Sequence, residues 1–252
     1  MLDGEYESVT AFVDEAIQHF SPGDRPAKRV LDFGCGSGGL VERLAARGYS
    51  IEGCDIKTFW DTSAPVASRL AEISHHPYRL PFDDRRFDVV ISTSVLEHAQ
   101  NKEELFQEIH RVLRPGGVAI HLYPSKWYLP IEPHIYVPLV NMFWPRCPKW
   151  WLSFWAWAGV RNEFQQRKPW REVSAINQQY CRDGLSYWSH AAYRKLSMAV
   201  FGHYSDETAF FVQRGYGGAA KGLRRLPIPT SLAGTICSTL RMSLLVNVKA
   251  GS

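Results

Sequence analysis

Residues 29–39 read RVLDFGCGSGG, an apolar run that ends in an acid and continues into a glycine-rich turn. The apolar residues between 30 and 33 predict a short buried strand. Residues 40–48, LVERLAARG, place apolar side chains at helical spacing and predict a helix that ends at Gly48. A strand, a glycine turn and a helix N-terminus in this order predict a site for a nucleotide-like cofactor.

The glycines also match the dinucleotide pattern as Gly34-x-Gly36-x-x-Gly39, which alone is a weak signal. Asp32 decides between the two interpretations, because it lies two residues before the first glycine. Its carboxylate would repel a pyrophosphate bound at this turn. A ligand without phosphate and with a cationic end, such as S-adenosylmethionine, suits an acid at that position.

A second acid follows at the expected distance from the turn. Residues 50–56, SIEGCDI, predict the next strand, with Asp55 at its carboxyl end. An acid about 20 residues beyond the glycine turn accepts hydrogen bonds from both ribose hydroxyls of an adenosine. The alternative is that Asp55 is a helix N-cap or a turn residue.

Composition bounds the class of protein. The chain has 252 residues, 45% of them hydrophobic, and a net charge of +4, which predicts one α/β domain with elaborations and no nucleic-acid partner. Its five cysteines are scattered without a C-x-x-C pair, so no zinc site or disulfide framework is expected, and a reducing cytosol is the expected compartment. No signal peptide and no run of 18 apolar residues is found.

A family resemblance rests on several motifs in order. The spacing Asp32-x-Gly34-x-Gly36-x-Gly38 resembles motif I of the class I S-adenosylmethionine-dependent methyltransferases. Between 80 and 117, LPF, FDVV, VLEH and RVLRPGG resemble the type 11 subgroup in order and spacing. The resemblance covers residues 30–124. It implies a Rossmann-like α/β fold, with a mostly parallel seven-stranded sheet, helices on both faces and S-adenosyl-L-methionine as cofactor.

The resemblance and the chemistry of the strand ends together give the expected cofactor site. In the family an acid holds the adenine amino group, but here His76 stands at that position and Pro77 lacks an N–H, so Tyr78 is expected to bind adenine instead. His98 either lines the pocket or packs in the core. The expected cofactor-binding residues are Asp32, Gly34, Cys35, Gly36, Gly38, Asp55, Ile56, Tyr78, Thr93 and His98.

The composition changes after residue 124. Seven of the nine tryptophans lie between Trp144 and Trp188. We expect residues 125–183 to be an insertion after the fifth strand that forms an acceptor lid within a single domain of residues 1–252, with a helix over 149–164. Two alternatives are a surface resting on a membrane interface, where tryptophan is favoured, and an aromatic subdomain core.

The remaining residues predict a return to the sheet. Residues 185–203 predict a helix, 204–213 the sixth strand and 243–249 the seventh. Residues 215–229 are rich in glycine and proline and predict a loop that carries Lys221, Arg224 and Arg225.

Methyl transfer to an oxygen of high pKa needs a base within reach of the acceptor. His134 and Glu132 are the candidate catalytic residues, because two prolines hold their loop, Pro130-Ile131-Glu132-Pro133-His134, stiffly. The alternative for His134 is a hydrogen-bonded surface group. No metal site is expected, because the adjacent pair His75-His76 would point apart on an extended chain.

The sequence therefore predicts S-adenosylmethionine-dependent O-methylation of a small or lipid-linked acceptor, such as a sugar or a specialised metabolite. N- and C-methylation remain open, as does a catalytically inactive cofactor-binding or scaffolding protein. Peripheral membrane contact of an otherwise cytoplasmic protein also remains open. A nucleic-acid substrate is disfavoured, because the chain has no Asn/Asp-Pro-Pro-aromatic motif for flipped bases.

Overall fold

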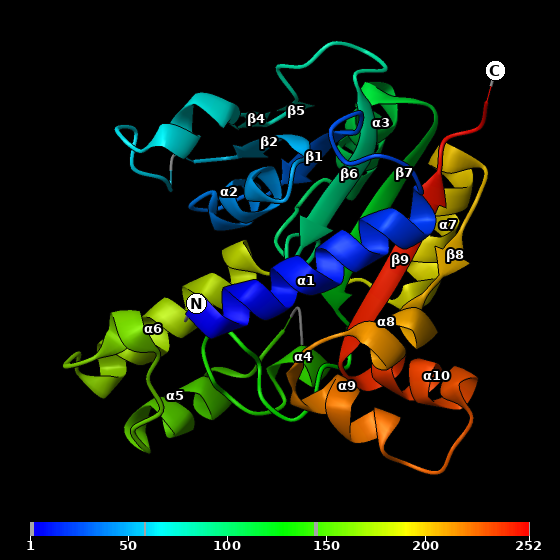
Figure 1. Ribbon diagram of the computed structural model, residues 1–252. Helices are drawn as coiled ribbons and strands as arrows, with labels where there is room; N and C mark the ends of the chain where they lie inside the picture. The colour runs from blue at the N-terminus through cyan, green and yellow to red at the C-terminus, as the bar shows by residue number, and fades with distance from the viewer. Residues whose placement is uncertain (1–2, 58, 144–145, 252) are drawn as a thin grey trace.

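A seven-stranded sheet forms the centre of the computed structural model, which describes residues 3–57, 59–143 and 146–251 (Figure 1). The strand order is β3-β2-β1-β6-β7-β9-β8. The first five strands in this order are parallel to one another, and β9 is antiparallel to its neighbours β7 and β8. The predicted fold class is confirmed. The strands are β1 (Arg29–Phe33), β2 (Ser50–Asp55), β3 (Leu70–Glu72), β6 (Phe87–Thr93), β7 (Leu113–Pro124), β8 (Ser205–Asp206) and β9 (Met242–Val248).

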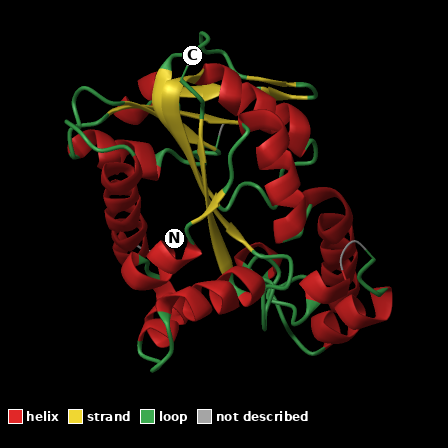
Figure 2. Ribbon diagram, turned by 90° about the vertical axis from the view of Figure 1, so that its right-hand side faces the viewer, coloured by secondary structure: helices red, strands yellow, loops and turns green. Residues whose placement is uncertain are grey.

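Helices cover both faces of the sheet, as the edge-on view shows (Figure 2). Strand side chains alternate between the two faces. On β1, Val30 packs with α1 and α2, whereas Leu31 packs with α3 on the opposite face. One face carries α1 (Asp3–Phe20), α2 (Gly39–Ala46), α8 (Thr208–Arg214), α9 (Gly217–Arg224) and α10 (Thr230–Leu240), and the other carries α3 (Lys102–Val112) and α7 (His190–Phe201).

The ion pair between Glu108 and Arg111 on α3 links the RVL motif to the LPF motif. The Arg111 guanidinium donates hydrogen bonds to the backbone carbonyls of Leu80 and Phe82 and to the Glu108 carboxylate. Glu108 in turn accepts a hydrogen bond of 2.9 Å from the Leu80 N–H. The pair therefore fixes the backbone of residues 80–82, which follows the hairpin of β4 (Ser74–His75) and β5 (Tyr78–Arg79).

The C-terminal part differs from the sequence prediction. Of the expected sixth strand over 204–213, only Ser205–Asp206 pair with β9, and most of the remainder belongs to helix α8. Its buried residues Thr208, Phe211 and Val212 have helical spacing, which outweighs the β propensity of the aromatic residues. The expected loop 215–229 contains α9. Helix α7 begins at His190, later than the predicted 185.

The insertion 125–183 contains α4 (Val140–Phe143), α5 (Lys149–Trp157) and α6 (Trp170–Gln179), and the predicted helix over 149–164 ends at Trp157. These elements enclose a hydrophobic cluster of their own, which includes Val137, Leu152 and Tyr187. Trp144 lies outside the described residues. Among the described helices, none has the length and apolar character needed to cross a bilayer.

Two contacts tie the end of the insertion to the sheet. The Ser186 N–H donates to the Glu97 carbonyl oxygen at 2.6 Å. The buried Lys102 ammonium donates to the carbonyls of Ala99 and Ser186. Burial lowers the pKa of Lys102 to about 7. The chain that closes the insertion is thereby held against the loop that follows β6.

Replacing Glu108 by glutamine should lower the free energy of unfolding by about 1–3 kcal/mol at pH 7, because charge-assisted hydrogen bonds to Arg111 and Leu80 are lost. Burial raises the pKa of Glu108, but those hydrogen bonds outweigh it and hold the pKa below its usual 4.5. This stabilisation is present above the unfolded-state pKa and is lost as pH falls through the folded-state pKa.

Urea titrations at pH 7 and at pH 3.5 measure the effect, and the difference between Glu108→Gln and the parent should shrink at the lower pH. Glu103→Gln is the matched control, because Glu103 lies exposed on the same helix. An equal loss in both variants at pH 7 would contradict the role given to Glu108.

Candidate functional site

In the glycine turn between β1 and α2, backbone N–H groups are hydrogen-bonded to carbonyls of the protein itself. Gly34 and Cys35 donate to the Cys54 carbonyl, and Gly38 donates to the Cys35 carbonyl. Gly34 has φ +79°, and a Cβ there would come within 2.3 Å of a Val95 methyl group. Because these N–H groups are already satisfied, the turn is poorly suited to bind a pyrophosphate.

The Asp55 carboxylate holds the fourth N–H of the turn. One oxygen accepts from Gly36 at 2.9 Å and the other accepts from Ile56 at 2.7 Å. Burial raises the pKa of Asp55 and outweighs these hydrogen bonds, which lower it. A third N–H, that of Lys57, also bonds this carboxylate. Because a carboxylate has about four acceptor sites, at least one is left for a ligand. Asp55 therefore also acts as a turn residue, which was one of the alternatives. It is not a helix N-cap, because the next helical turn begins at Pro65.

A cavity of about 210 Å³ opens beside Asp55. Its walls are mostly apolar, with Phe33, Ile73 and Tyr78 around the single carboxylate of Asp55. Behind the turn, Asp32 is only 2% exposed. Burial, and then the nearby Asp55 charge, raise the pKa of Asp32 to about 7. A cationic ligand group at this edge would favour the ionised form of both acids.

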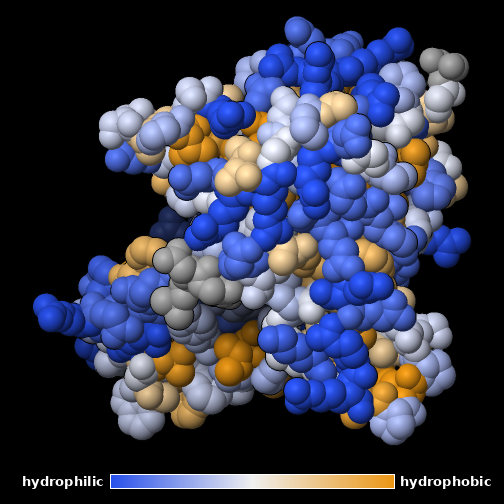
Figure 3. Space-filling view, viewed as in Figure 1, coloured by the Kyte–Doolittle hydropathy of each residue, from blue (hydrophilic) through white to orange (hydrophobic). Residues whose placement is uncertain are grey.

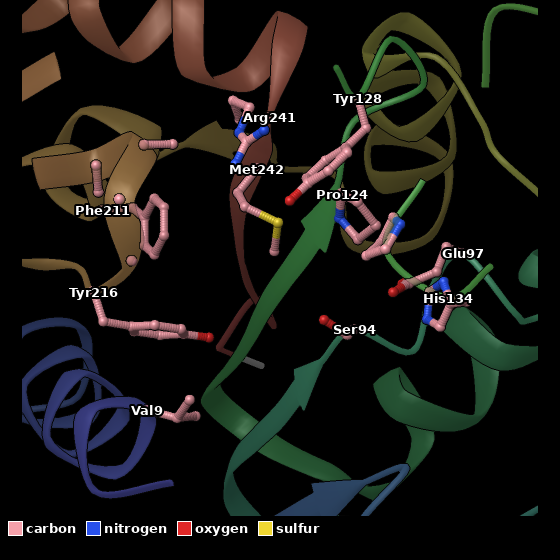
Figure 4. Close-up of a pocket in the computed structure, with 15 residues that line it drawn as sticks. Val9, Ser94, Glu97, Pro124, Tyr128, His134, Phe211, Tyr216, Arg241 and Met242 are labelled. Atoms are coloured by element: carbon pink, nitrogen blue, oxygen red, sulfur yellow. The ribbon is translucent and has the colours of Figure 1, made fainter. Parts of the chain in front are cut away.

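A second cavity, of about 310 Å³, shares a wall with the first. Ser94, which follows β6 with φ +55°, lines both cavities. Val9, Phe211 and Tyr216 supply apolar wall, and Arg241 supplies a positive charge (Figure 4). The two cavities thus meet at the carboxyl ends of the parallel strands, where open α/β sheets bind their ligands.

His134 lies in the wall of the second cavity and is positioned by Glu132. The Glu132 carboxylate, which is fully buried, accepts from His134 Nδ1 at 2.6 Å and from the Tyr187 hydroxyl at 3.1 Å. Its other oxygen accepts from the N–H groups of His134 and Ile135, both at 2.8 Å. Burial lowers the pKa of His134, but the Glu132 carboxylate outweighs burial and raises it.

Glu97 and His98 adjoin His134 from the loop after β6. The Glu97 carboxylate lies beside the His134 ring in the close-up of the cavity (Figure 4). His98 Nε2 lies 3.2 Å from His134 Nε2, while His98 Nδ1 lies 2.7 Å from the Gly184 carbonyl oxygen. Burial raises the pKa of Glu97 to about 7 and, with the charge on His134, lowers that of His98 to about 4.

Comparison with known proteins places this site in a family. The sequence model described as "Methyltransferase domain" matches residues 31–121. Residues 31–121 are therefore a methyltransferase domain of the type 11 subgroup, which is consistent with a class I S-adenosylmethionine-dependent methyltransferase.

Several curated methyltransferases resemble the chain over the same part. It is 28% identical over 134 residues to norajmaline N-methyltransferase of Rauvolfia serpentina, covering 48% of this chain and 45% of that protein. It is 31% identical over 104 residues to a sterol 24-C-methyltransferase of Gibberella zeae, covering 38% and 27%. The mitochondrial ubiquinone biosynthesis O-methyltransferase of Rattus norvegicus is 33% identical over 107 residues, covering 35% and 28%. The chain thus spans less than half the length of these relatives.

The fold extends the likeness beyond the methyltransferase motifs. The structure of geranyl diphosphate methyltransferase in complex with S-adenosylmethionine superposes with a TM-score of 0.53 at 15% identity, covering 96% of this chain and 85% of that one. The likeness therefore includes the sheet and its flanking helices, and it supports the fold alone.

Most residues expected at the cofactor site lie together. Gly34, Asp55, Ile56, Tyr78 and His98 line the first cavity. Asp32, Cys35, Gly36 and Gly38 form the strand end and turn behind it. Thr93 is the last residue of β6 and is not among the residues that line either cavity, whereas its neighbour Ser94 lines both.

The candidate catalytic residues His134 and Glu132 contact each other, but only His134 lines the second cavity. His134 reaches the cavity, but Glu132 is buried behind it and can act only through it. Glu97, Ser94 and Tyr187 are not among the site residues expected from the sequence. The VLEH motif contained the signal for Glu97, since it places an acid and a histidine in the loop that follows β6.

The tryptophans of the insertion do not supply the cavity walls. Trp150 and Trp157 are 66% and 68% exposed. Trp151 and Trp155 pack against the insertion's own cluster. None of the four is among the residues that line the two cavities, and the insertion contributes Tyr128, Pro133 and His134 to the second one instead.

Glu132→Gln should lower the pKa of His134, because the neutral amide removes the charge that opposes burial. NMR titration of the histidine ring resonances measures this shift directly. Glu163→Gln is the matched control, since Glu163 is exposed in the same insertion and should leave the pKa of His134 unchanged. An unchanged His134 titration in Glu132→Gln would show that the carboxylate does not set its proton affinity.

Proposed function

We propose that this protein transfers a methyl group from S-adenosylmethionine to a small or lipid-linked acceptor, most readily at an oxygen. The observation that carries the proposal is the shared wall at Ser94. One cavity there has a carboxylate and apolar sides, and the adjoining cavity has a positioned histidine. The arrangement brings two ligands together at one strand edge.

The residues of the first cavity fit the cofactor. S-adenosylmethionine supplies a methyl carbon activated by a positively charged sulfur. The Asp55 carboxylate can accept a hydrogen bond from the ribose of the cofactor, while Ile73 and Tyr78 offer apolar wall for an adenine ring. Buried Asp32 favours a cationic ligand over a phosphate. We assign these residues to cofactor binding.

The second cavity supports an acceptor whose hydroxyl needs a base. Glu132 holds the His134 proton on Nδ1, so Nε2 is the nitrogen available to take a proton. Glu132 is therefore a positioning residue and His134 the proposed base. Nitrogen and carbon acceptors do not always need a base. The relatives include N-, C- and O-methyltransferases. Apolar residues such as Phe211 and Tyr216 suit an acceptor with an apolar part.

Calorimetric titration tests the cofactor assignment. S-adenosylmethionine should bind saturably and NAD should not. Asp55→Ala should weaken the binding of S-adenosylmethionine by about 1.5–3 kcal/mol, the range for hydrogen bonds to a charged group. Asp61→Ala is the matched control, because Asp61 lies exposed in the loop after β2 and its carboxylate accepts hydrogen bonds from Ser63. Equal affinity of Asp55→Ala and the parent would remove the ribose assignment.

The exposed face of the insertion supports contact with a membrane surface that presents a lipid-linked acceptor. Trp150, Phe154 and Trp157 are exposed on α5, and Arg146 and Lys149 lie exposed beside them. Residues 133–162 contain no aspartate or glutamate. The lobe of α5 and α6 presents pale and orange surface on its lower side in Figure 3. Aromatic side chains with adjacent cations suit the interface of an anionic membrane.

Vesicle sedimentation measures this contact. The parent should be retained by vesicles with anionic lipid, and Trp150→Ala/Trp157→Ala should lose most of that retention, because the aromatic anchors are removed. Met198→Ala is the matched control, since Met198 is 50% exposed on α7. Retention of the double variant equal to that of the parent would count against a membrane role for α5.

A further inference from the structure

Three side chains converge between the two cavities. Glu97 and His98 come from the loop after β6, and His134 comes from the insertion. One ligand atom of each lies within 4.8 Å of the other two. Glu97 and His134 line the second cavity, and His98 lines the first. The cluster therefore lies where the two cavities meet.

Hydrogen bonds fix both histidine rings in one orientation. His98 Nδ1 faces the Gly184 carbonyl, and His134 Nδ1 faces the Glu132 carboxylate. Carbonyl and carboxylate oxygens only accept hydrogen bonds, so each Nδ1 carries the proton. In the neutral rings both Nε2 atoms then bear lone pairs, and they face each other at 3.2 Å. Two facing lone pairs repel, so a positive centre, either a proton on one Nε2 or a metal ion, belongs between or beside them.

Glu97 adds a buried carboxylate to the same place, with His134 and Lys102 as nearby cationic groups. Its side chain is 1% exposed, and neither carboxylate oxygen has a hydrogen-bond partner among the described residues. One of these oxygens lies 4.0 Å from His98 Nε2. A buried carboxylate without a partner is strongly disfavoured, and a nearby cation would remove that penalty.

From these observations we infer that Glu97, His98 and His134 bind one divalent metal ion at the junction of the two cavities. Two imidazole nitrogens and one carboxylate are a common ligand set for a divalent first-row transition metal ion with open positions. Glu132 and the Gly184 carbonyl complete the site from behind, because each holds the outer nitrogen of a ligand histidine. Ligands on one ion lie at most about 4.2 Å apart, so the side chains close slightly around it.

The ion gives the site a role in the proposed methyl transfer, and this role rests on the proposed function. An ion at the junction adjoins the acceptor cavity and lowers the pKa of an acceptor hydroxyl placed against it. The hydroxyl proton then passes to water, and His134 is a ligand instead of the base. The oxygen electron pair forms the bond to the methyl carbon. The carbon–sulfur bond breaks with its pair left on sulfur, which becomes neutral.

The test uses the full chain without an affinity tag, stripped of metal and titrated calorimetrically without S-adenosylmethionine or acceptor. Mn²⁺ is the main probe, because it has little affinity for thiols and the chain has five free cysteines. One Mn²⁺ should bind per chain, Zn²⁺ should bind more tightly and Mg²⁺ more weakly. Glu97→Gln and His98→Gln should each weaken Mn²⁺ binding at least tenfold, and Glu132→Gln should weaken it 10- to 100-fold.

His190→Gln is the matched control, because His190 also lies beside an acid, 3.3 Å from Asp206, outside the cluster. It should bind Mn²⁺ like the parent. The thermal midpoint of the parent should rise with Mn²⁺, and that of Glu97→Gln should not, although this variant should be folded and no less stable than the metal-free parent. A merely structural Glu97 would leave the metal-induced rise unchanged.

No saturable binding of Mn²⁺ or Zn²⁺, or equal affinity in the parent, Glu97→Gln and His98→Gln, would overturn the inference. A separate titration with S-adenosylmethionine keeps the two proposals apart. Mn²⁺ binding without cofactor binding would leave the metal site standing and remove the proposed methyl transfer. Cofactor binding without Mn²⁺ binding would do the reverse and return His134 to the role of base.

Discussion

The parallel pairing of β1 with β2 on one side and β6 on the other is the constraint on which the site depends. It brings the carboxyl ends of three strands to one edge, although the strands are far apart in the sequence. Asp55 at the end of β2 can then bond the Gly36 N–H that follows β1. Ser94, after β6, lies close enough to line the same cavity. Four N–H groups of the turn are thereby bonded within the protein, and carboxylates and apolar wall face the cavity.

A second constraint is the buried Glu132 carboxylate, which fixes the position of His134 from the insertion. It accepts hydrogen bonds from His134, Ile135 and Tyr187, which come from both ends of the insertion. A buried carboxylate is costly unless its lone pairs are filled, so these partners are held closely. The bond from Ser186 to Glu97 and the two from Lys102 then fix the end of the insertion beside the loop after β6. The histidine is rigid because the insertion is folded around the acid behind it.

Sequence reasoning succeeded where local pattern and chemistry agree. The turn from Asp32 to Gly38, the strand ending at Asp55 and the motifs between 80 and 117 each combine a period with residues of restricted conformation. They predicted the sheet correctly, and the residues expected at the cofactor site lie together in the structure. It failed at 204–213, where Phe and Tyr suggest a strand, but burial of residues three and four apart selects a helix. The contact of His98 with His134 spans 36 residues and depends on how the insertion folds back. No local pattern contains that contact.

Charge unites the parts of the site. Asp32, Asp55, Glu97 and Glu132 are four acids gathered at one strand edge, and three of them are almost fully buried. The residues lining the two cavities include one arginine, Arg241, and no lysine. Burial raises the pKa of Asp32 and Glu97 to about 7, so their negative forms are unstable near neutral pH without a cation. Positive ligands lower the free energy of this edge, and phosphates raise it. The same field that disfavours a dinucleotide at Asp32 therefore favours a sulfonium in the first cavity and a metal ion beside Glu97.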